Sequence, residues 1–358
     1  MSGAPPSALA VRPFRVAIEA AAVEDLRRRL RSRARPAAPF AGGKAEQAWA
    51  AGTDAHALEE LCAYWESGFE WRGAEAELNA WPQFKAKVDD VDLHFIHVAN
   101  AAPGAIPLLL VHGWPGSVYE FHRLLPLLAR DEAHPVSLVV PSLPGFGWSS
   151  IESGRGHSAL STAALLDKLM VGLGYAKYAV QGGDWGAVVV DTMAQQFPQR
   201  VCALHLNMPV APPLPGLLSG RAWFHRAVAV RDLLAPSLAL DAEDQHTVAR
   251  LRDYVKTGSS YFLVHSTRPG MVGPALNDSP VALLSWILEK FHAWTDRRGG
   301  PAPGLSRDQM LANVSIYWFT QTIESSMRFY LETVPLMPWV KDPWKERSYC
   351  SVPTAVAK

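Results

Sequence analysis

The stretch from Ala179 to Val190, AVQGGDWGAVVV, constrains the fold more than any other part of the chain. An apolar run typical of a buried strand stops at paired glycines, one aspartate follows, and a second apolar run begins after Gly186. Small residues on both sides of a single acid are typical of a tight strand-to-helix turn, because the backbone there leaves no room for Cβ atoms. The pattern predicts a strand, an elbow with Asp184 at its apex, and a helix from Trp185 to about Phe197.

The sequence from residue 92 to residue 206 repeats this alternation of short apolar runs and helical segments. The apolar runs include VDLHFIHVAN at the start of the region, then IPLLLVHG, SLVVPSLPGFG and VCALHLNM. Apolar strands that alternate with helices predict an α/β fold with a mostly parallel sheet and helices on both faces. In such folds the chemistry lies in loops at the carboxyl ends of the strands, which is where the elbow falls.

The flanking regions lack this alternation. Residues 1–91 show helical spacing with several aromatic side chains, and we expect them to form an accessory layer. Residues 207–330 begin with the bend PVAPPLPG and continue as helical segments rich in Trp, Phe and Leu, which predicts an inserted helical lid. Residues 331–358 would then be the remaining C-terminal part of the core.

An arginine-rich segment, VEDLRRRLRSRARP, lies in the first region. It predicts a helix with acids in its first turn and a proline stop at Pro36. Six arginines fall between Arg27 and Arg35, but Lys plus Arg and Asp plus Glu are 34 each in the whole chain. Because no net charge favours nucleic acid, we interpret these arginines as a solvated helix face.

The composition predicts an ordinary cytoplasmic protein. Cys62, Cys202 and Cys350 are far apart and form no CxxC pair, so we expect reduced core thiols instead of disulfides or a metal site. No HExxH pair occurs among the 12 histidines. The N-terminal MSGAPPSALAVRPFRV contains no long apolar segment, so neither a signal peptide nor a membrane anchor is expected.

The identity of the apex residue predicts the chemistry of the elbow. Serine usually occupies this position, and a serine that attacked a saturated carbon would leave an ether that water does not readily cleave. The carboxylate of Asp184 would leave an ester, which water can hydrolyse through its carbonyl group. The sequence therefore indicates displacement at the carbon of an epoxide or at a carbon that bears a halide. The alternative is that Asp184 only caps the following helix.

Two further segments supply the groups that this chemistry needs. The loop His112-Gly113-Trp114-Pro115 follows a buried strand, so the N–H groups of Trp114 and Trp185 are candidates for an oxyanion hole. We expect His112 to brace this loop, and Gly113, Pro115, Gly182, Gly183 and Gly186 to shape the two turns. In the lid, Tyr261 and Tyr330 are candidate proton donors to an epoxide oxygen, although each also reads as a packing tyrosine.

Taken together, these segments resemble one family. HGWPGS, GGDWG, SSYFLVHSTRP, ALNDSP, WILEKFHAWTD and SSMRFY, with PFRV and YWESGFEWRGAEAELNAWPQF near the start, resemble the microsomal-type epoxide hydrolases of the α/β-hydrolase superfamily over nearly the whole chain. The resemblance implies an N-terminal meander, Asp184 as the nucleophile, Trp114 and Trp185 as oxyanion donors, and Tyr261 and Tyr330 as donors to the epoxide oxygen. It further implies a small apolar epoxide and water as substrates, and no cofactor or metal.

The end of the chain departs from that family. Its relay acid and base histidine follow the nucleophile on loops after the final strands. Here no histidine follows His292, which falls in the lid pattern, and the chain ends with SVPTAVAK, which reads as the strand before the acid. We therefore expect a missing last strand and helix, at most one alkylation of Asp184 per chain, and slow release of diol. A haloalkane dehalogenase and a non-catalytic protein that binds small apolar ligands are the alternatives. No oligomeric state follows from the sequence.

Overall fold

A nine-stranded mixed sheet lies at the centre of the computed structural model, which describes residues 9–34, 49–151, 154–208, 249–250, 253–295, 305–337 and 350–357. The strands in chain order are β1 (Val11–Phe14), β2 (Gln83–Val88), β3 (Val91–Val98), β4 (Ile106–Val111), β5 (Val136–Pro141), β6 (Ser150–Ile151), β7 (Tyr178–Gly182), β8 (Val201–Leu206) and β9 (Thr354–Val356). Their order in space is β1-β2-β3-β5-β4-β7-β8-β9, and β6 pairs with β3.

The sheet is mostly parallel, as the sequence predicted. Strands β5, β4, β7, β8 and β9 run parallel, whereas β1, β2 and β3 pair with their neighbours in antiparallel fashion. The parallel strands are continuous apolar runs because helices and loops cover them: Leu109, Val139 and Val180 are almost fully buried. Helix α6 (Trp185–Gln196) packs against β4, β7 and β8, and α5 (Ala159–Gly172) packs beside it.

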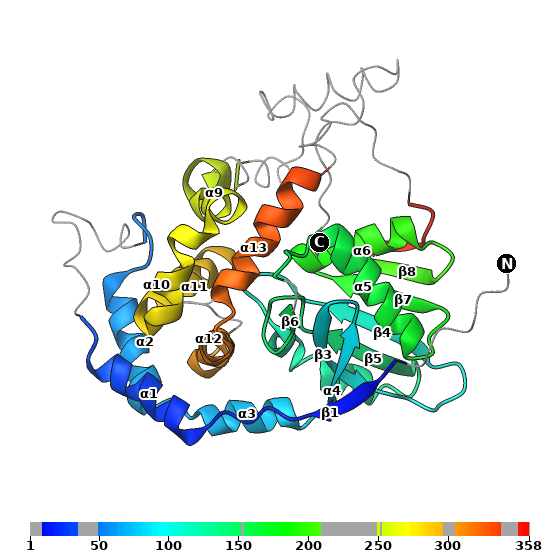
Figure 1. Cartoon of the computed structure of the whole chain (residues 1–358), viewed down its shortest axis with the longest axis horizontal. Helices are drawn as coiled ribbons and strands as arrows, with labels where there is room; N and C mark the ends of the chain where they lie inside the picture. The colour runs from blue at the N-terminus through cyan, green and yellow to red at the C-terminus, as the bar shows by residue number, and fades with distance from the viewer. Residues whose placement is uncertain are drawn as a thin grey trace, which may run out of the picture.

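The N-terminal region is more than an accessory layer, because two of its strands join the main sheet. Its helices are α1 (Ala20–Arg31), α2 (Ala55–Ser67) and α3 (Trp71–Asn79). Helices α1 and α3 run along the lower edge of the molecule toward β1, and α2 packs between α1 and lid helix α11 (Pro280–Trp294) (Figure 1). Strand β2 forms a hairpin with β3, and Asp89 in its turn has a φ of 52°. The alternating pattern of QFKAKV was the signal for β2, and the helical spacing before it obscured that signal.

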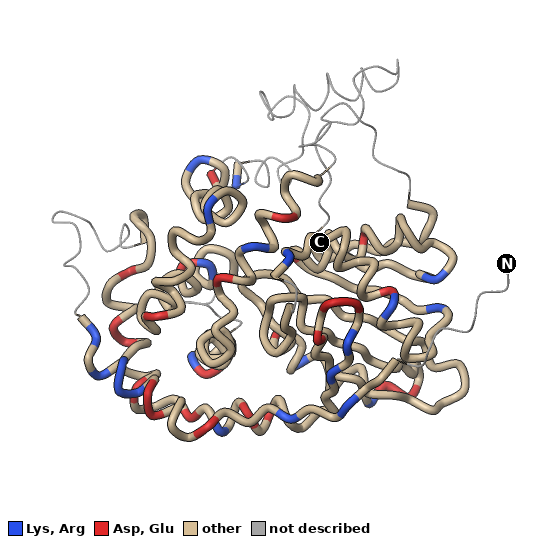
Figure 2. The backbone as a smooth tube through the Cα atoms, in the orientation of Figure 1, with Lys and Arg blue, Asp and Glu red and all other residues tan. Residues whose placement is uncertain are grey.

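The arginine-rich helix begins earlier than the sequence predicted. Helix α1 begins at Ala20, so Glu24 and Asp25 lie beyond its first turn, and it ends at Arg31; Pro36 lies outside the described residues. Two acidic residues are followed by several arginines along this part of the chain, and the backbone is coloured by these charges in Figure 2. Asp25 pairs with Arg28 and Arg29, Arg27 pairs with Glu70, and Arg31 pairs with Glu24.

Arg33 is the exception to the predicted solvated face, because its side chain is only 14% exposed and pairs with Glu59 and Glu66 of α2. These neighbours raise the pKa of its guanidinium further, so Arg33 ties α1 to α2 as a charged group.

The described lid consists of helices above the carboxyl edge of the sheet. They are α9 (Ser260–Thr267), α10 (Gly273–Asp278), α11 (Pro280–Trp294), α12 (Arg307–Thr320) and α13 (Ile323–Thr333). Ser279 caps α11, and Ser306 forms a capping box with Gln309 at the start of α12. The part of the predicted lid from residue 209 to 248 lies outside the described residues, and the domain boundaries stay a prediction.

Cys62 is buried and Cys350 half-buried, but Cys202 is exposed on β8, so the prediction of core thiols is wrong for Cys202. An outward position on a strand near the edge of the sheet explains the exposure. Within the described ranges, none of the helices has the length and apolar character needed to cross a membrane.

Candidate active site

The elbow between β7 and α6 holds Asp184 in an unusual backbone conformation. Asp184 has φ 50° and ψ −126°, a region that residues other than glycine rarely adopt and that tends to persist at functional sites. The elbow presses closely against the end of β4: a Cβ at Gly186 would overlap the carbonyl oxygen of Val111. Glycine at position 186 is therefore a condition for this turn, as the sequence pattern indicated.

The Asp184 side chain does not cap α6, which was the alternative to a catalytic role. It makes no capping hydrogen bond to α6, and its Oδ1 accepts a hydrogen bond from the backbone N–H of Trp114 at 2.8 Å. The backbone N–H of Trp185 also faces the carboxylate. A Cβ at Gly113 would overlap Asp184 Oδ1, so this glycine leaves the space that the carboxylate fills. The two N–H groups predicted as oxyanion donors thus converge on the Asp184 carboxyl group.

Burial controls the ionisation of Asp184. Asp184 is half-buried, and the backbone N–H groups of Trp114 and Trp185 lie against its carboxyl group. Loss of hydration raises the pKa of Asp184 to about 6, and the N–H groups of Trp114 and Trp185 limit the rise because they stabilise the charged form. The carboxylate is ionised at neutral pH and poorly hydrated, which suits a nucleophile.

The loop after β4 is braced from both sides. His112 Nδ1 lies 3.0 Å from the carbonyl oxygen of Gly113, and His112 Nε2 accepts a hydrogen bond from the N–H of Leu143 at 3.1 Å. Burial lowers the pKa of His112 to about 4, so the ring is neutral and fits the bracing role expected for it. The Trp114–Pro115 peptide bond is cis.

Helix α12 of the lid fastens the same loop. Asn313 Nδ2 donates to the carbonyl oxygen of Pro115 at 2.7 Å, and the Tyr317 hydroxyl donates to that of Gly116 at 2.7 Å. No sequence motif predicts these contacts, because they join residues far apart in the chain.

The two predicted lid tyrosines meet above the elbow. Tyr261 comes from α9 and Tyr330 from α13, and their ring centroids are 6.1 Å apart. Tyr261 stacks on Trp114 with centroids 5.3 Å apart, and Tyr330 meets Trp185 edge to face at 4.7 Å. Burial and the negative charge of Asp184 raise the pKa of both phenols, so both keep their protons at neutral pH and can donate them.

Three neighbours of these tyrosines were not predicted from the sequence. The Tyr254 hydroxyl lies 3.1 Å from that of Tyr261, on the short π-helical turn η4 (Tyr254–Gly258). His265 accepts a hydrogen bond from Trp286 Nε1 at 3.2 Å, and burial lowers its pKa to about 3. A third neighbour, Lys290 of α11, places Nζ 4.3 Å from the centre of the Tyr261 ring and pairs with Glu289. A lysine inside the apolar run WILEKF was the one available signal.

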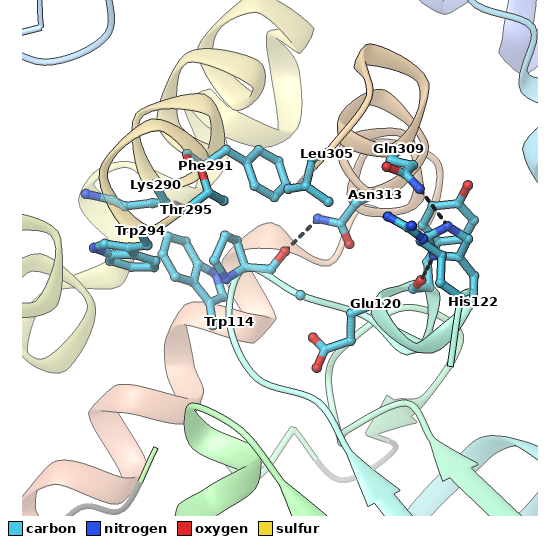
Figure 3. Close-up of a pocket in the computed structure, with 14 residues that line it drawn as sticks. Trp114, Glu120, His122, Lys290, Phe291, Trp294, Thr295, Leu305, Gln309 and Asn313 are labelled. Carbon is cyan, nitrogen blue, oxygen red and sulfur yellow. Dashed lines mark hydrogen bonds between the residues drawn. The ribbon is translucent and has the colours of Figure 1, made fainter. Parts of the chain in front are cut away.

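A pocket of about 300 Å³ opens between this loop and the lid (Figure 3). Trp114 and Glu120 lie on the core side, and Phe291, Trp294 and Leu305 lie on the lid side. Asp184, Tyr261 and Tyr330 are not among the lining residues, so Trp114 is the link between the pocket and the elbow. Across the part of the chain that the structure describes, no group of three or more His, Cys, Asp or Glu side chains could hold a metal ion.

Family models match two stretches of the chain. The model described as the N terminus of epoxide hydrolases matches residues 11–121. The model described as the alpha/beta hydrolase fold matches residues 106–253.

Individual relatives extend these matches. Epoxide hydrolase 1 of Oryctolagus cuniculus is 36% identical over 344 residues, which are 90% of this chain and 73% of the relative. Juvenile hormone epoxide hydrolase of Bombyx mori is 35% identical over 338 residues, which are 90% of this chain and 70% of the relative.

Solved structures agree with the sequence matches. The crystal structure of juvenile hormone epoxide hydrolase from Bombyx mori superposes with a TM-score of 0.82 at 33% identity and covers 97% of this chain and 82% of that one. The epoxide hydrolase of Aspergillus niger superposes with a TM-score of 0.81 at 30% identity and covers 98% and 83%. With its α/β-hydrolase fold, this chain belongs to the epoxide hydrolase family, whose function is the hydrolysis of epoxides to diols.

Proposed function

We propose that this chain opens epoxides through an ester on Asp184. The Asp184 carboxylate attacks a ring carbon, the carbon–oxygen bond of the ring breaks, and a phenol of Tyr261 or Tyr330 gives its proton to the departing oxygen. Water then adds to the carbonyl carbon of the ester, the bond to the diol oxygen breaks, and the surplus proton of the water returns the phenolate to a phenol as Asp184 becomes a carboxylate again. The N–H groups of Trp114 and Trp185 would stabilise the negative oxygen that forms in this second step.

One observation carries the proposal: an ionised, poorly hydrated carboxylate lies beneath two protonated phenols. The Oδ1 of Asp184 is fixed by the Trp114 N–H at 2.8 Å, while burial, with a smaller contribution from the negative charge of Asp184, raises the pKa of Tyr261 and Tyr330. A nucleophile with two neighbouring proton donors matches the needs of a strained ring whose oxygen must be protonated as it leaves.

The pocket favours a small apolar substrate. Trp114, Phe291, Trp294 and Leu305 contribute apolar side chains to its wall, and the ring of Tyr261 stacks on Trp114. We infer an epoxide that carries an apolar or aromatic group.

A haloalkane dehalogenase would share the aspartate elbow and Trp185. A halide leaving group takes no proton, however, so dehalogenation gives no reason for two protonated phenols beside the nucleophile. A non-catalytic binding protein would have no reason for the strained backbone at Asp184.

Mass spectrometry of the intact chain tests the proposal. After incubation with styrene oxide, we expect a mass increase of one epoxide, mapped by proteolysis to the peptide that contains Asp184. Asp184→Asn is the matched control, because it keeps the size of the side chain and removes the nucleophilic charge. Halide release from a chloroalkane without any adduct from styrene oxide would favour the dehalogenase. Binding of styrene oxide without an adduct would favour the binding protein.

A further inference from the structure

Asn313 of α12 binds the loop after β4 with both ends of its side-chain amide. Its Nδ2 donates to the carbonyl oxygen of Pro115 at 2.7 Å, and its Oδ1 accepts a hydrogen bond from the Ser117 hydroxyl at 2.8 Å. Figure 3 shows Asn313 reaching from α12 to this loop. A flipped amide would face the Pro115 carbonyl with another oxygen, so these two partners fix the orientation of the buried Asn313 side chain.

Tyr317 lies one helical turn after Asn313 and holds the next carbonyl group of the loop. Its hydroxyl donates to the carbonyl oxygen of Gly116 at 2.7 Å, and its ring is buried. Residues four positions apart lie on the same face of a helix. One face of α12 therefore binds the consecutive carbonyl groups of Pro115 and Gly116. We call Asn313 and Tyr317 the α12 clamp.

Helix α12 is anchored at places away from this face. Trp65 Nε1 of α2 donates to the Ser315 hydroxyl at 3.0 Å, and both side chains are almost fully buried. In the first turn of α12, Gln309 Nε2 lies 2.9 Å from His122 Nε2, at the end of the 3-10 helix η2 (Val118–Phe121). These contacts make α12 a fixed support for the loop that it binds.

The carbonyl groups that the clamp holds directly follow the donor that holds the nucleophile. The N–H of Trp114 donates to Asp184 Oδ1 at 2.8 Å. The carbonyl group of Gly113 belongs to the same peptide unit as this N–H, and His112 Nδ1 lies 3.0 Å from its oxygen. The Trp114 N–H is thus placed between a histidine contact on one side and the α12 clamp on the other.

Building on the proposed function, we propose that Asn313 and Tyr317 are positioning residues, which hold the Trp114 N–H against the Asp184 oxygen that becomes the oxyanion. Because this N–H binds Oδ1, Oδ2 attacks the epoxide carbon and Oδ1 stays as the carbonyl oxygen of the ester. When water adds to the carbonyl carbon, an electron pair of the double bond moves onto Oδ1. A hydrogen bond to this oxyanion is stronger than one to an ester carbonyl, so the clamp matters most for breakdown of the ester.

Ser315 provides the matched control for the clamp. It lies between Asn313 and Tyr317 in the sequence and is equally buried, but its hydroxyl bonds to Trp65 and makes no printed contact with the loop. Ser315→Ala therefore removes a buried hydrogen bond of α12 and leaves the clamp in place. A purely structural role of α12 would make Ser315→Ala and Asn313→Ala behave alike.

Nuclear magnetic resonance reads the hydrogen bond of the Trp114 amide without any reaction. The chain contains only two Gly–Trp pairs, at residues 113–114 and 147–148. Glycine labelled with carbon-13 at its carbonyl carbon and tryptophan labelled with nitrogen-15 therefore select two amide signals. The signal that is lost in Trp114→Phe belongs to Trp114, and the signal of Trp148 serves as an internal reference.

A hydrogen bond to a carboxylate moves the resonance of an amide proton to higher frequency. We expect Asn313→Ala to move the Trp114 signal to lower frequency and to leave the Trp148 signal in place. Tyr317→Phe keeps the ring and removes one hydrogen bond, so it should move the Trp114 signal in the same direction by a smaller amount.

The pH dependence of adduct formation gives a second measurement. The N–H of Trp114 stabilises the charged form of Asp184, so a weaker bond should raise the midpoint in Asn313→Ala by roughly half to one pH unit. Among the described residues, the titratable side chains that feel the charge of Asp184 are Glu120, Tyr254, Tyr261, Tyr317 and Tyr330. Asn313→Ala leaves all of them in place.

Cleavage of the ester by hydroxylamine tests the largest effect. Styrene oxide alkylates the chain, gel filtration removes the epoxide, and hydroxylamine is added at neutral pH. Its nitrogen bonds to the carbonyl carbon, the bond to the diol oxygen breaks, and Asp184 becomes a hydroxamate, which mass spectrometry distinguishes from the acid. The reaction passes through the same oxyanion on Oδ1. We expect Asn313→Ala to slow it by roughly 10- to 100-fold and to change adduct formation at high pH far less.

Ser315→Ala should match wild type in all three measurements, and urea denaturation shows how far each variant is destabilised. An Asn313→Ala chain that matches Ser315→Ala in these measurements would overturn the positioning role. Equal cleavage by hydroxylamine in wild type and Asn313→Ala would overturn the part of the clamp in ester breakdown. A wild-type chain that forms no adduct would contradict the proposed function, whereas the amide signals still decide whether the clamp holds Trp114.

Discussion

The elbow and the lid build the two halves of the site in different ways. At the elbow, backbone groups fix the position of the nucleophile. Asp184 has a strained φ of 50°, the N–H of Trp114 donates to its carboxylate, and Gly186 lets the turn approach β4. In the lid, Tyr261 and Tyr330 are placed by packing of their rings against Trp114 and Trp185.

The difference teaches where each half tolerates change. A turn without space for a methyl group admits no substitute for glycine, because neighbouring backbone cannot move aside. A ring held by ring contacts keeps its place when only its hydroxyl is removed. Changes at the elbow should therefore destroy the fold locally, whereas changes in the lid can remove the chemistry and leave the fold intact.

The strongest test of this contrast is Gly186→Ala. The added methyl group would overlap the carbonyl oxygen of Val111, so we expect a loss of about 3 kcal/mol or more in the free energy of unfolding, or a chain that does not fold. Urea denaturation followed by circular dichroism measures it. The matched control is Gly73→Ala in α3, where a Cβ meets nothing within 4 Å, and where alanine should stabilise the helix by up to about 1 kcal/mol. Equal stability of the two variants would contradict the view that backbone crowding fixes the elbow.

Removal of the phenol hydroxyls in the lid should have the next largest effect. Tyr261→Phe and Tyr330→Phe should each slow formation of the Asp184 adduct by roughly 10- to 100-fold, and the double variant by roughly 1000-fold or more, because one donor partly replaces the other. The stability of each variant should change little. Tyr178→Phe removes another buried phenol, which donates to Asp167 at 2.6 Å, and should leave adduct formation unchanged. A double variant as fast as wild type would remove the tyrosines from the mechanism.

The smallest expected effect is the change in the rate of adduct formation with pH, which tests how strongly the elbow desolvates Asp184. Since burial raises the pKa of Asp184 to about 6, the reactive carboxylate is lost as pH falls through that value. The rate should decrease about tenfold per pH unit below about pH 6 and level off above it. The pKa of both phenols is raised, so their protons should not limit the rate on the acid side. A midpoint near the ordinary value of aspartic acid, about 4, would show that the elbow does not desolvate its acid.

Much of the fold and part of the site could be predicted from the sequence. The elbow was readable because all its determinants, from Gly182 to Gly186, are contiguous, and the loop from His112 to Pro115 was readable for the same reason. Other features depended on distant residues. The N-terminal strands join the sheet only through pairing with β3, Arg33 is buried by α2, and Cys202 faces outward on β8. No local pattern reports such contacts.

The sequence by itself determined that an aspartate lies at the apex of a tight turn after a parallel strand. The glycine spacing and the apolar runs that specify the turn, the strand and the helix are all contiguous in the chain. Only the tertiary structure decided which phenols lie near that aspartate and how far burial shifts its pKa. These properties arise from the loss of water and from charges brought together by folding, and neither exists along an extended chain.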